Sequence, residues 1–166
     1  MCTALQAAVL CPGLPELRPV RGQVSWVPCA EGPPHLLSYG GYAGPVEDQL
    51  LLGASFVRGD AGSDLRVQDH AHNLARLQEA APALAARLPG LSQWQGRASV
   101  RAQTRNYQPV LGPVPACTPG LWVLTGLGSK GYSYAPLGAE ALCALMLGEP
   151  APLPATVLQS LSPGRG

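Results

Sequence analysis

Hydrophobic and polar positions follow two different periods along this chain. Polar and apolar residues alternate over 23–27 and again over 96–104, a spacing that is typical of half-buried β-strands. Two apolar runs, at 36–39 and 50–57, are separated by glycine and proline residues and predict two further strands. We therefore expect an antiparallel meander over this part of the chain.

Between these strands the hydrophobic period changes to three and four residues. The pattern predicts a helix from about Asp69 to Leu88, with Asp69 as its N-cap. Pro82 is expected to kink or split this helix, because proline removes a backbone donor and clashes with the preceding turn. The apolar stripe that carries the prediction consists of Leu74, Leu77, Ala81, Leu84 and Leu88.

The last third of the chain contains a strand, a glycine-rich turn and a helix in succession. The continuous apolar run Leu121–Leu124 is typical of a strand that is buried on both faces. After the glycine-rich segment 125–131, a helix is predicted over 136–147, with Pro136 near its first turn, and a short helix over 156–161. Such a turn can bind an anion or a dinucleotide, because free backbone N–H groups and the helix dipole attract negative charge. A tight strand-to-helix turn without a ligand is the alternative.

Composition narrows the class of protein. Of the 166 residues, 46% are hydrophobic and 13% charged, and the formal net charge is +1. These values exclude a disordered tail and a dedicated electrostatic nucleic-acid surface within these residues. No apolar run approaches the roughly 18 residues that a membrane span needs, and the first residues lack the basic region of a signal peptide. We therefore expect a cytoplasmic protein that does not associate with membranes.

Cysteine and histidine do not suggest a metal site. The cysteines are odd in number and widely spaced, which predicts free thiols in a reducing compartment. His70 and His72 are two residues apart, so a regular helix would direct them to different faces, and we interpret both as structural or surface residues. The five cysteines are Cys2, Cys11, Cys29, Cys117 and Cys143.

Several short motifs occur in register and together point to a known family. Six of them lie at Arg18–Pro28, Leu52–Phe56, Asp69–Leu74, Arg101–Arg105, Leu111–Pro115 and Gly126–Gly131. With Ala135-Pro-Leu, Gly148-Glu-Pro and Ser162-Pro-Gly-Arg165, this set resembles the C-terminal part of the flavin domain of the MnmC family. That family comprises bifunctional enzymes of tRNA 5-methylaminomethyl-2-thiouridine biosynthesis, and the resemblance covers the chain from about Leu17 to Arg165.

The resemblance implies a partial D-amino-acid-oxidase-like flavoprotein fold of mixed α+β and α/β type. It places the end of an FAD-domain segment at 1–20 and an antiparallel-sheet substrate domain at 21–105. Residues 106–166 would be the strand, loop and helix with which the chain returns into the Rossmann-like FAD domain. In the family, the dinucleotide-binding motif and an S-adenosylmethionine-dependent methyltransferase domain precede the matched part. This chain alone is therefore not expected to hold FAD tightly.

The glycine-rich segment is expected to contact the cofactor. Its residues Gly126, Leu127, Gly128, Ser129, Lys130 and Gly131 resemble the family's G-L-G-S-R-G loop, which lies at the flavin. Lys130, the only lysine of the chain, replaces the usual arginine and is expected to neutralise either the flavin or the substrate carboxylate. It keeps the positive charge but lacks the planar, bidentate fork of arginine.

Four further residues are implied in substrate binding. Arg101 and Arg105 match a motif of the family and are expected to bind the substrate carboxylate or the tRNA backbone, with solvent-facing strand arginines as the alternative. Arg21 is expected near the site, with a structural role at the strand entry as its alternative, and Tyr42 is expected to line the pocket, with aromatic packing as its alternative. Lys130 and Arg105 are the two candidates for a catalytic role.

Three functions remain open from the sequence. In the first, the chain is part of an FAD-dependent oxidoreductase that removes the carboxymethyl group from 5-carboxymethylaminomethyl-(2-thio)uridine at the wobble position of tRNA. In the second, the same fold oxidises a small amine, as glycine and sarcosine oxidases do. In the third, the chain is a non-catalytic fragment or subunit that needs a separately encoded N-terminal half, which binds FAD and carries the methyltransferase.

Overall fold

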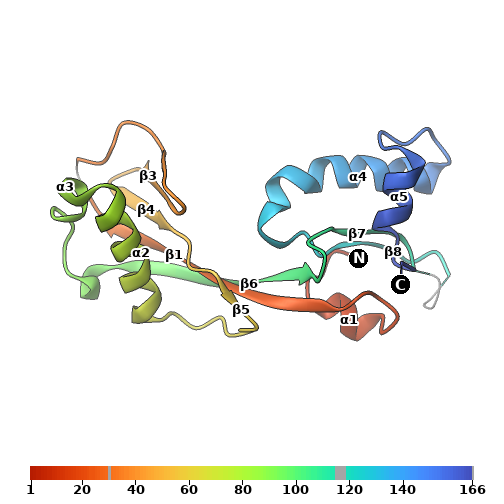
Figure 1. The fold of residues 1–166 in the computed structure, drawn as a ribbon, viewed down its shortest axis with the longest axis horizontal. Helices are drawn as coiled ribbons and strands as arrows, with labels where there is room; N and C mark the ends of the chain where they lie inside the picture. Colours follow the sequence, from red (N-terminus) through yellow and green to blue (C-terminus); the bar gives the residue numbers. More distant parts are fainter. Residues whose placement is uncertain (30, 115–118, 166) are drawn as a thin grey trace. The chain divides into compact units, whose positions relative to one another are not determined.

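The computed structural model describes residues 1–29, 31–114 and 119–165. The chain forms two compact units, one of Met1–Val20 together with Arg101–Gly166 and the other of Arg21–Val100. We call the first the hairpin unit and the second the sheet unit. Strands β1 (Leu17–Pro28) and β6 (Gln95–Thr104) carry the chain from one unit into the other (Figure 1).

The sheet unit is built on antiparallel strands. Its sheet has the order β2-β3-β4-β1-β5, and β6 also pairs with β1. Leu52 of β4 lies opposite Ser25 of β1 on one side and Ala43 of β3 on the other. These three residues are therefore aligned across three neighbouring strands. The other elements are β2 (Leu37–Ser38), β3 (Tyr42–Val46), β4 (Gln49–Gly53), β5 (Val57–Arg58), α2 (Val67–Ala80), α3 (Pro82–Ala85) and the 3-10 helix η1 (Leu91–Gln93).

The core of the sheet unit lies between one face of the sheet and helices α2 and α3. Val27, Leu50 and Leu52 from the strands pack with Leu77 from α2, and all four are fully buried. Trp94 closes the cluster, and its indole N–H donates a hydrogen bond of 2.9 Å to the carbonyl of residue 89. Burial of these side chains is the main force that holds the helices on the sheet.

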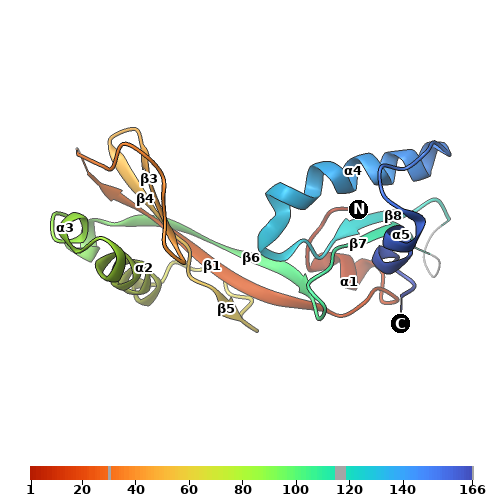
Figure 2. The same cartoon turned by 45° about the horizontal axis from the view of Figure 1, so that its top comes forward.

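The hairpin unit is built on a two-stranded antiparallel hairpin with a helix beside it (Figure 2). Val110 and Val123 pack with Cys11 on one face of the hairpin, whereas Leu111 and Leu124 pack with helix α4 on the other. Both faces are therefore buried within the unit. Its elements are α1 (Gln6–Leu10), β7 (Val110–Pro113), β8 (Trp122–Thr125), the 3-10 helix η2 (Gly128–Lys130), α4 (Gly131–Leu147) and α5 (Ala155–Leu161).

Most of the predicted elements are present. The strands predicted at 23–27 and 96–104 are confirmed within β1 and β6, the strand predicted at 121–124 overlaps β8, and the predicted helix is divided at Pro82. The run 121–124 is buried on both faces as expected, but its partner strand is antiparallel. Strand β3 was not predicted, because it contains Gly44 and Pro45, which are unfavourable in strands.

Two helix starts differ from the prediction. Helix α2 begins at Val67 with Arg66 as its N-cap, so the expectation that Asp69 caps it is wrong; the carboxylate of Asp69 binds Arg21 instead. Helix α4 begins at Gly131, and Pro136 therefore lies inside it rather than near its first turn. The helix continues through this proline, whose nitrogen cannot donate the usual backbone hydrogen bond to the preceding turn.

The expected cysteine chemistry is also corrected at one position. Cys2, Cys29 and Cys143 are free thiols, as expected, whereas Cys11 is disulfide-bonded. Cys117 lies outside the described residues. Among the helices that the structure describes, none combines the length and the apolar character that crossing a bilayer requires.

Candidate functional site

The turn between β8 and α4 has a conformation that its glycines permit. Gly126 and Gly128 have φ angles of +71° and +54°, in the left-handed region that side chains with a Cβ rarely adopt. A Cβ on Gly126 would lie 3.0 Å from the Thr104 methyl group, so the backbone of the turn packs closely on the end of β6. The two glycines thus allow the left-handed backbone conformation of the turn and its close approach to the neighbouring strand.

The end of β6 fixes the position of this turn. Gln103 forms an isolated antiparallel bridge with Leu127, and its side-chain amide lies against Gly128, where a Cβ would be 3.0 Å from the amide nitrogen. The backbone N–H of Lys130 donates to the carbonyl of Leu127 at 3.1 Å, which forms the single turn of η2. Helix α4 starts directly afterwards, so its first N–H groups, which have no partners within the helix, belong to this turn.

A cavity of about 330 Å³ opens beside the turn. Arg101, at the point where β6 enters the hairpin unit, lines it together with the turn and with the first residues of the chain. The structure therefore brings Arg101 to the same cavity as Gly126, Leu127, Gly128 and Gly131. The complete lining consists of Cys2, Ala4, Arg101, Ala102, Leu124, Thr125, Gly126, Leu127, Gly128, Gly131 and Ala135.

Lys130 and Ser129 are exposed and do not line this cavity. The Lys130 ammonium group lies 3.4 Å from the hydroxyl oxygen of Tyr134 and 5.6 Å from the centre of its ring. These two residues are four apart on the same side of the helix start, which is the spacing at which helical side chains meet. Lys130 thus leans along α4 toward Tyr134 in this structure.

The spacing of the three glycines is a signal that our sequence reasoning missed. Gly126, Gly128 and Gly131 have the spacing G-x-G-x-x-G, the fingerprint of dinucleotide-binding loops. That fingerprint requires a strand–helix–strand unit with a parallel sheet. Here β8 is antiparallel to β7, and α4 is followed by helix α5, so the surrounding structure is a different one. What the motif retains is a set of glycines that line a cavity at the N-terminus of a 17-residue helix.

Arg105 does not join Arg101 and the glycine turn. It follows the last residue of β6 and lines a separate hollow of about 520 Å³ with Glu16, Asn106 and Arg165. Arg101 and Arg105, which match one motif, therefore line two different hollows, and the expected role of each in substrate binding stays a prediction. Tyr42 lies in the sheet unit, where its ring covers Gly53 so closely that a Cβ there would be 2.6 Å from it. This packing contact with Gly53 explains the position of the Tyr42 ring.

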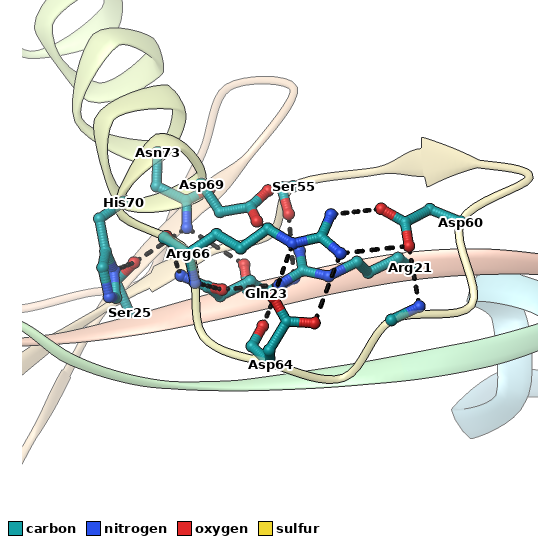
Figure 3. A network of polar contacts seen from close by, with 11 residues as sticks. Arg21, Gln23, Ser25, Ser55, Asp60, Asp64, Arg66, Asp69, His70 and Asn73 are labelled. Atoms are coloured by element: carbon teal, nitrogen blue, oxygen red, sulfur yellow. Dashed lines mark hydrogen bonds and ion pairs between the residues drawn. The ribbon is translucent and has the colours of Figure 1, made fainter.

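Arg21 is fully buried at the centre of a polar network in the sheet unit (Figure 3). Its guanidinium forms an ion pair with Asp69 of α2, donates 3.0 Å to the side chain of Gln23 and also donates to the carbonyl of Asp64. The side chain has no exposed surface in this chain, which fits the structural alternative at the strand entry, and the expected role of Arg21 in substrate binding stays a prediction.

Gln23 completes the connection between β1 and the start of α2. Its amide nitrogen donates 2.8 Å to the carbonyl of Arg66, and its amide oxygen accepts 2.9 Å from the N–H of the same residue (Figure 3). Arg66 in turn pairs with Asp60 and Asp64, which closes the loop that precedes the helix. The Arg21-Gly22-Gln23 motif therefore positions a loop and a helix.

His70 also belongs to this network. Its Nδ1 lies within hydrogen-bonding distance, 2.7 Å, of the hydroxyl of Ser25, which also accepts a hydrogen bond of 3.0 Å from Asn73. Burial lowers the pKa of His70, and the charge of Asp69 opposes this shift. The structural interpretation of His70 fits this geometry. Within the described residues, no group of three His, Cys, Asp or Glu side chains is arranged to hold a metal ion.

Comparisons with known proteins identify the kind of protein to which these features belong. The family model of FAD dependent oxidoreductases matches residues 1–145. A tRNA 5-methylaminomethyl-2-thiouridine biosynthesis bifunctional protein MnmC from Caulobacter sp. (strain K31) is 46% identical over 149 residues, which are 90% of this chain and 25% of that protein. The protein of the same name from Acinetobacter baylyi is 43% identical over 99% of this chain and 27% of its own length. The chain thus spans about a quarter of these relatives.

Solved structures show the same fold. Glycine oxidase from Geobacillus kaustophilus superposes with a TM-score of 0.77 at 23% identity, over 98% of this chain and 42% of that one. Fructosamine oxidase from Aspergillus fumigatus superposes with a TM-score of 0.72 at 16% identity, over 97% of this chain and 43% of that one. At these identities the superpositions establish a partial D-amino-acid-oxidase-like flavoprotein fold and nothing about the substrate.

Proposed function

The chain belongs to the family of FAD-dependent oxidoreductases, and from this premise we propose that the cavity beside the glycine turn faces the flavin. The observation that carries the proposal is that Gly126, Gly128 and Gly131, at the start of α4, line one cavity together with Arg101. A Cβ on Gly131 would meet only one atom within 4 Å, the Cβ of Leu127 at 4.0 Å, so this glycine leaves free space at the helix N-terminus. The residues present therefore fit one edge of a flavin ring.

FAD, when bound, supplies the acceptor for the electrons that leave an oxidised amine. The part of this chain would be electrostatic: N–H groups at the N-terminus of α4 and of the glycine turn favour negative charge beside them. Because these groups are fixed by η2 and by the bridge from Gln103 to Leu127, they need no rearrangement when charge appears. Arg101 adds a full positive charge to the same cavity and can bind a substrate carboxylate.

Lys130 has a different part in this proposal. Its side chain is exposed and flexible, and its ammonium group starts from a contact with Tyr134. If the side chain rotated away from Tyr134, its ammonium group could instead bind an anionic group at the mouth of the cavity, because a lysine carries its point charge on a flexible stem. We expect Lys130→Ala to weaken the binding of carboxylate substrates and to raise their KM about tenfold. We also expect the absorption spectrum of bound FAD to shift. Unchanged values of both would remove Lys130 from the site.

The substrate in this proposal is a modified tRNA. The relatives at 43–46% identity are named as tRNA 5-methylaminomethyl-2-thiouridine biosynthesis proteins, and their likeness covers 90% or more of this chain. We infer that the chain is the C-terminal portion of an oxidoreductase that removes the carboxymethyl group from 5-carboxymethylaminomethyl-(2-thio)uridine at the wobble position. The cytoplasm, where tRNA is modified, is the corresponding place of action. Arg101 would bind the carboxylate of the group that is removed.

Anaerobic reduction of added FAD tests this substrate directly. The chain and FAD are mixed with tRNA that carries the carboxymethylaminomethyl group, and separately with glycine and with sarcosine, while the flavin absorbance near 450 nm is followed. Of the three substrates, we expect only the tRNA to bleach the flavin in the presence of the chain. The variant Arg101→Gln should slow this bleaching. Bleaching by glycine or sarcosine would favour a small-amine oxidase instead. Absence of bleaching with every substrate would leave the chain as a non-catalytic portion that needs a separately encoded half.

A further inference from the structure

The second hollow of the hairpin unit is a concentration of positive charge in a nearly neutral chain. Three of the ten arginines, Arg18, Arg105 and Arg165, lie on it or beside it, although the whole chain carries a net charge of only +1. Its volume is about 520 Å³, and its lining consists of Pro15, Glu16, Thr104, Arg105, Asn106 and Arg165.

Glu16 is the one carboxylate among the described residues that line this hollow, and it is already neutralised. Glu16 accepts two hydrogen bonds from the guanidinium of Arg18, at 3.1 and 2.9 Å. These bonds hold the pKa of Glu16 below its ordinary value, and the charge of Arg105 acts in the same direction. Glu16 and Arg18 therefore cancel, and the hollow keeps the charges of Arg105 and Arg165.

The two remaining arginines differ in how they are held. Arg105 is exposed and forms no hydrogen bond or ion pair among the described residues, so all of its donors are available. Arg165 donates 2.8 Å to the carbonyl of Pro109, 2.6 Å to that of Ser160 and 2.9 Å to that of Gln108. Of the five N–H groups of a guanidinium, about two are left on Arg165, and their direction is fixed by the other three.

We propose that this hollow binds a phosphodiester group of RNA. The unpartnered guanidinium of Arg105 and the fixed one of Arg165 can each donate to one of the two non-bridging oxygens of a phosphodiester, which arginine binds with better geometry than lysine. Neither arginine has a carboxylate within ion-pair distance among the described residues, so an anion would not have to displace a protein partner. The choice of RNA as the source of the phosphate rests on the proposed function.

The hollow is distinct from the cavity beside the glycine turn. The two share no lining residue, and Arg105 and Arg101 fall into different ones. A site that is open to solvent and lined by arginine suits a group on an extended polymer, whose phosphates position it without reading its bases. The pyrophosphate of FAD has the same chemistry and is the alternative source, which the experiment below separates.

Salt-dependent RNA binding of the full chain tests the proposal. The probe is a fluorescently labelled tRNA, and its Kd is measured by anisotropy between 25 and 200 mM salt for the wild type, Arg105→Gln and Glu16→Gln. Each phosphate contact contributes about 0.7–0.9 to the slope of log K against log salt. We expect Arg105→Gln to raise Kd about fivefold at the lowest salt and to reduce the slope by about one contact. Glu16→Gln should lower Kd, because it removes a negative charge from the hollow and releases Arg18 from its ion pair.

Arg87→Gln is the matched control, since it removes one exposed arginine of the sheet unit. An equal effect of Arg87→Gln and Arg105→Gln, or no RNA binding by the wild type, would overturn the proposal. FAD titrations of the same variants distinguish the phosphate sources. Loss of FAD binding in Arg105→Gln would assign the hollow to pyrophosphate instead. Because RNA binding needs no flavin turnover, failure of the oxidation experiment leaves this measurement valid.

Discussion

The polar network around Arg21 and the glycine turn before α4 differ in whether their polar groups have partners within the protein. In the network, the side chains of Arg21, Gln23 and Asp69 are buried and almost every donor has a partner within the sheet unit. In the turn, the backbone of Gly126 and Gly128 carries no side chain, and an open cavity lies beside it. Polar groups that are satisfied internally stabilise the fold, whereas polar groups left open can bind a ligand.

This difference separates two motifs that both matched the family. Arg21-Gly22-Gln23 and Gly126–Gly131 would be equal candidates if a match to a motif were the only criterion. Burial decides between them, because Arg21 has no exposed surface and Gly131 has free space in front of it. Substitutions should therefore reduce stability at the first motif and ligand binding at the second.

The largest expected effect on stability is the loss of Arg21. Arg21→Ala leaves the Asp69 carboxylate buried without its partner, and breaking such a buried pair costs about 3–5 kcal/mol. Urea unfolding, followed by tryptophan fluorescence, measures this loss. The double variant Arg21→Met/Asp69→Leu should recover most of the stability, because it removes both charges. A single variant as stable as the wild type would contradict the role that we assign to the network.

A matched exposed arginine serves as the control for this variant. Arg87 pairs with Glu31 at 3.5 Å on the surface of the same unit, and both side chains are more than half exposed. Arg87→Ala should change the unfolding free energy by less than about 1 kcal/mol, since exposed ion pairs contribute little.

A methyl group on Gly126 should have an intermediate effect. Gly126→Ala combines a left-handed φ of +71° with a contact of 3.0 Å to Thr104, and the strained backbone alone costs about 1–2 kcal/mol. Gly59→Ala has a similar φ of +78° but nothing within 4 Å, so it isolates the strain from the contact. In urea unfolding, Gly126→Ala should be less stable than Gly59→Ala. Equal losses would mean that the turn does not pack on β6.

The smallest effect concerns the pH dependence of the sheet unit. Burial lowers the pKa of His70 below the ordinary value of 6.5, so the unfolded chain binds a proton more readily than the folded chain. The unfolding free energy should therefore rise with pH, and stability should be lost as the pH falls through about 6.5. Urea unfolding at pH 7.5 and pH 5.5 should show this loss, and His70→Gln should reduce it. An identical dependence in both proteins would exclude His70 as its source.

Local patterns in the sequence were sufficient for most of the elements but not for the contacts between them. Alternation over 23–27 and the position of Pro82 could be interpreted from neighbouring residues alone. The pair Arg21–Asp69 joins residues 48 positions apart, and nothing in the local sequence indicates it. Asp69 at the start of an apolar stripe has the signature of an N-cap, and only the fold shows that Arg21 binds it.

The separation of Arg101 from Arg105 has a similar cause. Residues four apart on a strand face the same side, which favours one shared site. Strand β6 ends at Thr104, however, and Arg105 falls in the turn that follows, where this alternation no longer applies. The glycine spacing at 126–131, in contrast, could have been recognised from the sequence, although its structural setting could not.

Binding of FAD to the chain and to Gly131→Leu is the measurement that tests the flavin-facing turn most directly. Gly131 has an ordinary helical conformation and free space, so a side chain there should leave the unfolding free energy unchanged or raise it, while it fills the cavity. We expect FAD fluorescence to be quenched by the wild type in a weak but saturable titration, and Kd to rise at least about tenfold in Gly131→Leu. Gly90→Leu, at another open glycine, should bind FAD like the wild type. No saturable binding by the wild type, or equal affinities of the wild type and Gly131→Leu, would contradict the assignment.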